Sequence, residues 1–237
     1  MQRLHLSTNK KSITIVMPIS AKTEIDVFIV GYDPNSPRTE YFNRKIKVNG
    51  PDTIYFQCPQ SPKRLAIIAW SSAKGKFKIG PIKVEPLVRN LAILGDRQHD
   101  IMFIELFSRR VGRMPPRRTY FHKGASFRID LLPVIRKDNG KKHSTPARIH
   151  VSKPIIQVSK EAFDRMTIPQ RVAILFHEYS HNFINRNQDS EMEADSNMVD
   201  LYKGLGYGKL EAVYAFANVM SDTDTNYNRL MNIGNKL

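Results

Sequence analysis

Short apolar runs alternate with turn signals over residues 12–87. Five of these runs are rich in β-branched and aromatic residues, as strands are: SITIVM, EIDVFIV, TIYFQC, RLAIIAW and KFKIGPIKV. The intervening DPNSP, NGPD, PQSPK and SAKGK supply the residue types that turns require. The pattern predicts a small all-β, sandwich-like domain.

The pattern changes near residue 88, where helical and strand-like segments begin to mix. QHDIMFIELFSRRV has the periodicity of a helix, and the proline-broken GRMPPRR after it indicates a loop. SFRIDLLPVI and PIIQVS have the character of strands and flank the polar, basic segment RKDNGKKHSTPAR. A short sheet is therefore expected in the second part of the chain.

The last third of the chain is predicted to be helical. Thr167 and Gln170 fit a capping box, Pro169 is tolerated in the first turn, and VAILF favours a buried helix through HEYSHNFI. Ser190 and Glu193 fit a second capping box that opens SEMEADSNMVDLYKG. A third helix, KLEAVYAFANVM, follows the glycine-rich GLGYG, and a short helix closes the chain.

These elements predict an α+β protein of two domains. Residues 1–87 are expected to form the sandwich-like domain, for binding or anchoring, and residues 88–237 a domain with a short sheet and a helix hairpin. An apolar content of 41% is enough for a buried core. No apolar run approaches the roughly 20 residues that a membrane span needs.

Positive charge is concentrated in the first part of the chain. The net charge is +15, but residues 1–153 carry a net charge of +18 and residues 154–237 one of −3. This excess favours an acidic protein partner or nucleic acid at the basic N-terminal part. A basic surface that only keeps the protein in solution is an equal alternative.

The N-terminal MQRLHLSTNKKSITIVMPIS is interpreted as a first strand and not as a signal peptide. Thr14 and Pro18 interrupt its apolar patch, and no small-residue cleavage site follows. Cys58 is the only cysteine, which excludes an intramolecular disulfide, and we expect a buried, unreactive thiol. The expected location is cytoplasmic or virion-associated.

The segment HEYSH, inside the predicted buried helix, has the spacing of a zinc site. His177 and His181 are four residues apart, so both can present an imidazole nitrogen to one metal ion from the same helix face. Glu178 lies beside the first histidine and is not a ligand. It is placed to act as the catalytic base of a metallopeptidase, as H-E-x-x-H implies.

A catalytic zinc needs a third protein ligand, and its position separates the families. The metzincin pattern requires glycine at 184 and histidine at 187, where this chain has Ile184 and Asn187. HEYSH is instead followed, after a loop, by EMEAD at residues 191–195. In this respect the sequence resembles the minimal gluzincin metallopeptidases, marked by H-E-x-x-H and E-x-x-A-D. The resemblance covers roughly residues 150–220.

The resemblance implies that Glu191 is the third zinc ligand and that Asp195 supports His177 from behind. Glu191 and Asp195 would share one face of their helix, which is consistent with these roles. Glu193 is the alternative carboxylate, but it would face elsewhere and suits the helix cap. The resemblance also implies that PIIQVS lies along the substrate cleft, where an extended peptide could add as a further strand.

Other residues carry weaker signals. The segment RRVGRMPPRRTYFHKG mixes arginines with aromatic residues, as single-strand binders of nucleic acid do, but a basic loop is the better interpretation. The remaining histidines considered as ligands are expected at the surface or bonded to backbone: His122, His143 and His150. The donor that stabilises the transition state is not identified, and the tyrosines considered for it are Tyr202, Tyr207, Tyr214 and Tyr227.

Three functions fit these patterns. The leading hypothesis is a zinc-dependent endopeptidase with a protein or peptide substrate and a β-domain that holds the substrate or anchors the enzyme. The second is a structural component of a larger assembly, such as a bacteriophage virion or tail, that retains a metallopeptidase-like fold. The third is a nucleic-acid binder with a structural zinc, but such a site gains nothing from Glu178 beside its ligands.

Overall fold

The structure is a computed structural model, and it describes the chain except residues 73–75, 138, 144, 151–152, 186, 218–223 and 237 and the side chains of Arg38, Asp224 and Thr225. The chain divides into two compact units. Unit 1 comprises Met1–Arg89 with Gly206–Gly208, and unit 2 comprises Asn90–Leu205 with Lys209–Leu237. The change of unit after Arg89 lies two residues beyond the predicted boundary. Gly206–Gly208 belongs to unit 1, although the prediction assigned these residues to the second domain.

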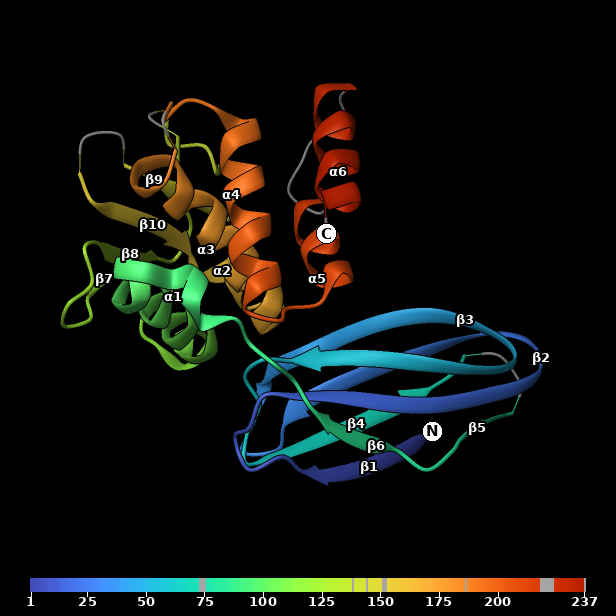
Figure 1. Ribbon diagram of the computed structural model, residues 1–237. Coiled ribbons are helices and arrows are strands. Elements are labelled where there is room, and N and C mark those ends of the chain that lie inside the picture. Colours follow the sequence, from blue (N-terminus) through green and yellow to red (C-terminus); the bar gives the residue numbers. More distant parts are fainter. Residues whose placement is uncertain are drawn as a thin grey trace. The chain divides into compact units, whose positions relative to one another are not determined.

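Unit 1 is built on one antiparallel sheet of six strands (Figure 1). The order is β1-β4-β2-β3, and β5 and β6 also pair with β2. The strands are β1 Gln2–Ser7, β2 Ile13–Asp33, β3 Ser36–Cys58, β4 Arg64–Trp70, β5 Phe77–Ile79 and β6 Lys83–Pro86. Alternate residues of β2 are buried from Ile13 to Ile29, so one face of the sheet forms the core.

The two longest strands bend, so that the sheet folds over onto itself. The rings of Phe42 and Phe56 stack with their centroids 3.9 Å apart. Fourteen residues of straight strand would separate them by roughly 46 Å, so β3 must turn back between them. Gly50, with φ of 78°, pairs with Ala21, and the register of β2 shifts just after this pair. These bends bring the two halves of β3 face to face.

Unit 1 therefore differs in detail from the sequence prediction. The predicted turn NGPD is a bend within β3, and SITIVM and EIDVFIV belong to the single strand β2. The N-terminal segment forms two strands, separated by a turn in which Asn9 and Lys10 have positive φ. SAKGK lies partly outside the described residues. Cys58 is buried, as predicted.

Unit 2 contains a four-stranded mixed sheet in the order β7-β8-β10-β9. The two central strands, β8 and β10, are parallel, and the edge strands run antiparallel to their neighbours. The strands are β7 Arg118–Tyr120, β8 Arg128–Leu132, β9 Ala147–Ile149 and β10 Ile155–Ser159. The predicted strands SFRIDLLPVI and PIIQVS correspond to the central pair.

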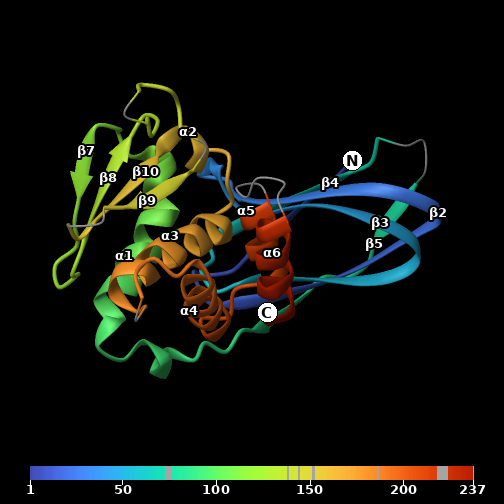
Figure 2. The same cartoon turned by 90° about the horizontal axis from the view of Figure 1, so that it is seen from above.

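Helix α3 is the centre of unit 2, between the sheet and the helices α4 and α5 (Figure 2). Most of its residues are buried, which explains its long apolar run VAILF. The α-helices of unit 2 are α1 Gln98–Arg110, α2 Lys160–Phe163, α3 Ile168–Phe183, α4 Glu191–Gly204, α5 Lys209–Ala217 and α6 Asp224–Lys236. Two 3₁₀ segments, Leu91–Arg97 and Val111–Arg113, flank α1.

The predicted helices are present in the structure. QHDIMFIELFSRR forms α1, and the capping box of Thr167 and Gln170 opens α3. The third predicted helix is observed as α5 up to Ala217, and its last residues, 218–220, lie outside the described part. Within the described part of the chain, no helix has the length and apolar character needed to cross a bilayer. The molecule is thus a mixed α and β protein with a large antiparallel sheet and a second, small sheet.

Candidate metal centre

The C-terminal half of α3 carries three of the predicted site residues. His177 and His181 are one helical turn apart and therefore share a face. Both side chains are largely buried, at 9% and 10% relative exposure. Glu178 follows His177 and points to a different side of the helix, because successive helical positions are about 100° apart. The two imidazoles are therefore presented together, with the carboxyl beside them.

Helix α4 follows after a short loop and begins at the predicted third ligand, Glu191. Ser190 is its N-cap, and its hydroxyl accepts a hydrogen bond of 3.2 Å from the Glu193 N–H. The Glu193 carboxylate accepts a hydrogen bond from the N–H of Asn187 in the loop. The structure thus brings Glu191 to the histidines, whereas the carboxylate of Glu193 is bonded to the loop that precedes the helix.

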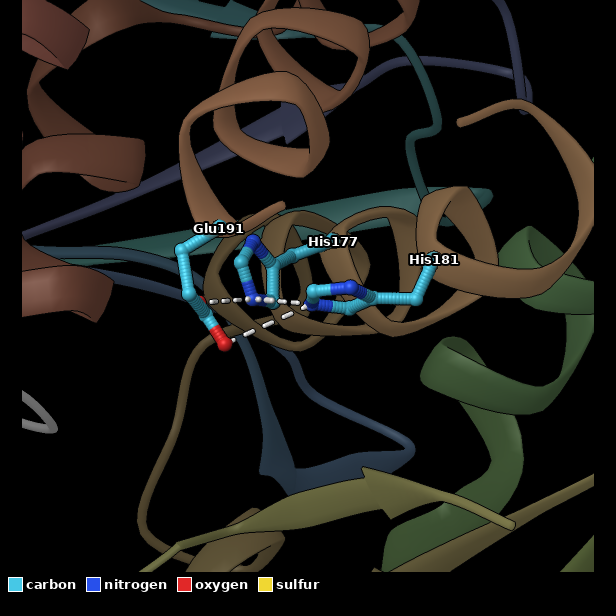
Figure 3. A group of neighbouring side chains, drawn as sticks. All are labelled: His177, His181 and Glu191. Atoms are coloured by element: carbon cyan, nitrogen blue, oxygen red, sulfur yellow. Dashed lines mark hydrogen bonds and ion pairs between the residues drawn. The ribbon is translucent and has the colours of Figure 1, made fainter. Parts of the chain in front are cut away.

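Three potential ligand atoms meet between α3 and α4 (Figure 3). The two Nε2 atoms of His177 and His181 are 3.2 Å apart. Glu191 Oε2 lies 3.3 Å from Nε2 of the first histidine, and its Oε1 lies 3.7 Å from Nε2 of the second. Ligands at about 2.0–2.2 Å from a tetrahedral zinc are roughly 3.3–3.6 Å from one another. The group therefore has the spacing of three corners of a zinc site.

The far side of each imidazole faces an oxygen. Nδ1 of His177 is 2.9 Å from Oδ1 of Asp195, and Nδ1 of His181 is 2.6 Å from the carbonyl oxygen of Gln188. In the metal-binding form both rings would be neutral, with the hydrogen on the Nδ1 atom that faces the acceptor oxygen. Both Nε2 lone pairs then point at the same place, which is the arrangement a metal ion requires. The donor set fits zinc, which binds imidazole and carboxylate.

In the metal-free centre, the neighbouring carboxylates favour the protonated form of His177. Burial lowers the pKa of His177, but Asp195, Glu191 and Glu178 together outweigh this effect and raise it to about 9. The hydrogen bond with His177 lowers the pKa of Glu191 to about 2, although burial opposes it. At neutral pH the first histidine therefore holds a proton that a metal ion must displace.

Glu178 lies in the same cavity as the three potential ligands. This cavity has a volume of about 340 Å³ and is lined by Glu178, the two histidines and Glu191, among others. The Oε2 atom of Glu178 accepts a hydrogen bond of 2.8 Å from the Ile149 N–H. Burial raises the pKa of Glu178 to about 7, against the opposing effects of His177 and this hydrogen bond. A carboxyl with this pKa is suited to accept a proton near neutrality.

The strand beside the cavity is β9, not the predicted PIIQVS. PIIQVS forms β10, which is paired on both sides and cannot accept a further strand. β9 is one of the two edge strands of the sheet, the other being β7. Residues of an antiparallel edge strand alternate between facing their partner and facing outward. Ile149 faces outward, since its N–H reaches Glu178, so the open edge of the sheet borders the cavity.

Arg229, on α6, is a site residue that the sequence analysis missed. Its guanidinium contacts Glu191 Oε2 at 2.7 Å and Asp195 at 2.8 and 3.0 Å. No motif marks it, because it lies in a segment predicted only as a short closing helix. The sequence offers only a weak signal, which is that Arg229 is one of two cationic residues in α6, the other being Lys236.

The other residues considered from the sequence contribute less. None of the four candidate tyrosines lines the cavity of the metal centre as described. Tyr202 and Tyr207 are buried, and Tyr214 and Tyr227 are exposed. Of the three remaining histidines considered, His143 lines the cavity, and its Nδ1 accepts a hydrogen bond from the Thr145 N–H. All three are partly exposed: His122, His143 and His150.

Comparison with models of protein families, with curated proteins and with solved structures gives no match to this chain. The functional argument therefore depends on the residues of the centre and their geometry.

Proposed function

We propose that the protein is a zinc-dependent metallopeptidase of the gluzincin type, with His177, His181 and Glu191 as the metal ligands. The observation that carries the proposal is the convergence of three side chains. The Nε2 atoms of His177 and His181 are 3.2 Å apart, and each lies within 3.7 Å of an oxygen of Glu191, in a cavity that also contains Glu178. A purely structural zinc site is closed by four protein ligands and needs no base. Three ligands with a further carboxyl beside them, that of Glu178, favour catalysis.

Each residue has a distinct part in the proposed reaction. Zinc in this centre would act as a Lewis acid that polarises the scissile carbonyl and lowers the pKa of the attacking water. Glu178 takes a proton from that water and delivers it to the nitrogen of the leaving amine. Asp195 holds the His177 ring in the tautomer that offers Nε2 to the metal.

The edge of β9 supports binding of an extended peptide. A peptide that pairs with this edge extends the sheet by one strand and brings its backbone beside Glu178. The outward-facing groups of β9 are those of Ala147 and Ile149. The Ala147 carbonyl accepts from Thr145 Oγ1 and the Ile149 N–H donates to Glu178, so a pairing peptide would replace these two partners. Because backbone groups carry the pairing, we expect the substrate to be an unfolded or extended segment of a protein.

Zinc binding tests the centre itself. Purified protein should bind one zinc ion, and His177→Ala, His181→Ala and Glu191→Ala should each weaken binding because each removes a ligand. Glu193→Ala is the matched control, since it changes a neighbouring carboxylate that lies outside the group of ligands. Metal content and affinity can be measured by competition with a chelator. Equal zinc content in all of these proteins would remove the basis of the proposal.

The Glu178→Gln variant tests the reaction. It keeps the shape of the side chain but removes the carboxylate that accepts the proton, so turnover of an unfolded protein substrate should fall at least about 100-fold. Zinc affinity should change little, because the three ligands remain. If zinc-loaded wild-type protein and Glu178→Gln are equally inactive towards unfolded and candidate partner proteins, the centre is a structural clip between α3 and α4. The assembly component considered from the sequence would then be the better hypothesis.

A further inference from the structure

Arg229 connects the C-terminal helix to two residues of the metal centre at once. Its Nε and Nη2 atoms contact the two carboxylate oxygens of Asp195, at 2.8 and 3.0 Å. Its Nη2 also lies 2.7 Å from Oε2 of Glu191. Asp195 in turn faces His177, so one guanidinium contacts the third ligand and the residue behind the first ligand. The planar fork of arginine suits such bidentate contacts.

Apolar packing contributes little to the attachment of α6 to α4. Ile233 is the one buried residue of α6 among the side chains that the structure describes. A cavity of about 340 Å³ lies between the two helices, lined by residues of both, so the apolar contact is incomplete. Further polar links lie at Lys236, whose Nζ contacts Asp200 at 2.9 Å and the carbonyl of Ser196 at 3.1 Å, and whose own carbonyl accepts a hydrogen bond of 3.1 Å from Lys203 Nζ. Arg229 is therefore a main attachment of α6.

The contacts of Arg229 restrict the two carboxylates to the orientations that the centre uses. With Arg229 on Oδ2, the Oδ1 atom of Asp195 remains directed at Nδ1 of His177. With Arg229 on Oε2, the Glu191 side chain remains folded towards the histidines although half of its surface is exposed. An exposed carboxylate without such a restraint populates several rotamers, and binding a metal then costs the entropy of selecting one.

We propose that Arg229 is a positioning residue of the metal centre and that α6, through Arg229, docks more firmly when the metal is bound. This inference rests on the metal-binding part of the proposed function and not on peptidase activity. Coupling of this kind is reciprocal, since whatever docking of α6 adds to metal affinity, metal binding adds to the docking of α6. The helix thus belongs to the centre, although it supplies no ligand.

A competing physical effect has the opposite sign. A guanidinium near the centre repels a divalent cation, so its removal could raise metal affinity. The two carboxylates that Arg229 contacts offset its charge, and changes of such outer-shell partners typically cost about 10- to 100-fold in metal affinity. We therefore expect the loss of orientation to exceed the gain from reduced repulsion.

The experiment compares zinc affinity, by chelator competition at pH 7, for wild type, Arg229→Gln, Arg229→Lys and Lys236→Met. Arg229→Gln should bind zinc about 10- to 100-fold more weakly. Arg229→Lys keeps the charge but not the fork, so it should be intermediate. Lys236→Met is the matched control, because it removes the side-chain contacts of another α6 cation, which does not contact Glu191 or Asp195. Its affinity should stay within about threefold of wild type, as expected for a partner outside the ligand shell.

Amide hydrogen exchange of α6 supplies the second readout. Zinc should slow exchange in α6 of wild type and of Lys236→Met, and should have little effect on it in Arg229→Gln. Equal losses of affinity in Arg229→Gln and Lys236→Met would show that Arg229 acts only through general stability, and tighter zinc binding by Arg229→Gln would show that repulsion dominates. Either result overturns the inference and leaves the proposed function standing. Wild-type protein that binds no zinc would overturn both.

Discussion

Three titrating side chains of the centre control how the stability of the metal-free protein depends on pH. Glu191 has a folded pKa of about 2, below its ordinary 4.5, so its contribution is present above about pH 4.5 and is lost as the pH falls through 2. Glu178 has a pKa raised from 4.5 to about 7, so folding disfavours its ionisation, and the stability falls as the pH rises from 4.5 to 7. His177 has a pKa raised to about 9, so its contribution is full below 6.5 and is lost as the pH rises through 9.

From these signs we predict that the free energy of unfolding of the metal-free protein falls as the pH rises from 5 to 9. Denaturant unfolding at several pH values measures it, with a chelator present. Glu178→Gln should lose the part of this slope between pH 4.5 and 7, since the amide does not titrate. Zinc should oppose the fall above pH 6.5, because it displaces the proton of His177. An identical slope in Glu178→Gln would contradict the assigned pKa of this carboxyl.

At the scale of single residues, local motifs predicted most of the centre. Helical spacing alone places His177 and His181 of HEYSH on one face, and the resemblance of EMEAD to the gluzincin pattern added Glu191. Arg229 could not be predicted in this way, because its place depends on how α6 packs against α4. A side chain that acts through a tertiary contact between distant segments leaves no local pattern.

At the scale of elements, Thr167 at the start of α3 caps this helix and also links it to α5. Thr167 Oγ1 accepts from the Gln170 N–H, and it also donates to Glu211 Oε2 on α5 at 2.9 Å, in a buried environment. Thr167→Ala should therefore cost about 2–4 kcal/mol, because a cap contributes about 1 kcal/mol and removal of one partner of a buried hydrogen bond costs about 1–3. Ser190→Ala, which removes the cap of α4, should cost about 1 kcal/mol.

Denaturant unfolding of the zinc-free variants measures this difference, so that metal binding does not mask it. If the two substitutions cost the same, the hydrogen bond between α3 and α5 adds nothing to the cap.

Helices were easier to predict from the sequence than strands, for a physical reason. A helix is closed by local hydrogen bonds, and residues near its ends, such as Thr167 and Ser190, mark its boundaries. A strand is paired over long range, so Gly50 with Pro51 and Asp52 marks a turn by composition but is only a bend in β3. β2 pairs with β3 on both sides of this bend, and this long-range pairing determines the outcome. Which strand lies at the edge of the small sheet was also beyond local patterns.

At the scale of the whole molecule, the proposed centre lies entirely in unit 2. The ligands, Glu178, Asp195, Arg229 and the edge strand β9 all belong to it. Basic residues are shared between the units, since residues 1–89 carry a net charge of +9 and residues 90–153 a further +9. The basic residues that could contact an acidic partner are therefore not confined to the first domain. The association with such a partner remains a prediction.

The division into units leads to the last prediction: a fragment of residues 90–237 should fold and bind one zinc ion. Its core includes α1, α3 and the small sheet, which are complete in the fragment. Deletion exposes Gly206–Gly208, which belongs to unit 1, but these residues form a short connection between α4 and α5. Circular dichroism and zinc stoichiometry test the prediction, with His177→Ala in the same fragment as control. A fragment that is helical but binds no zinc would mean that the first 89 residues are needed to shape the centre, and one that does not fold would mean that the two units unfold as one.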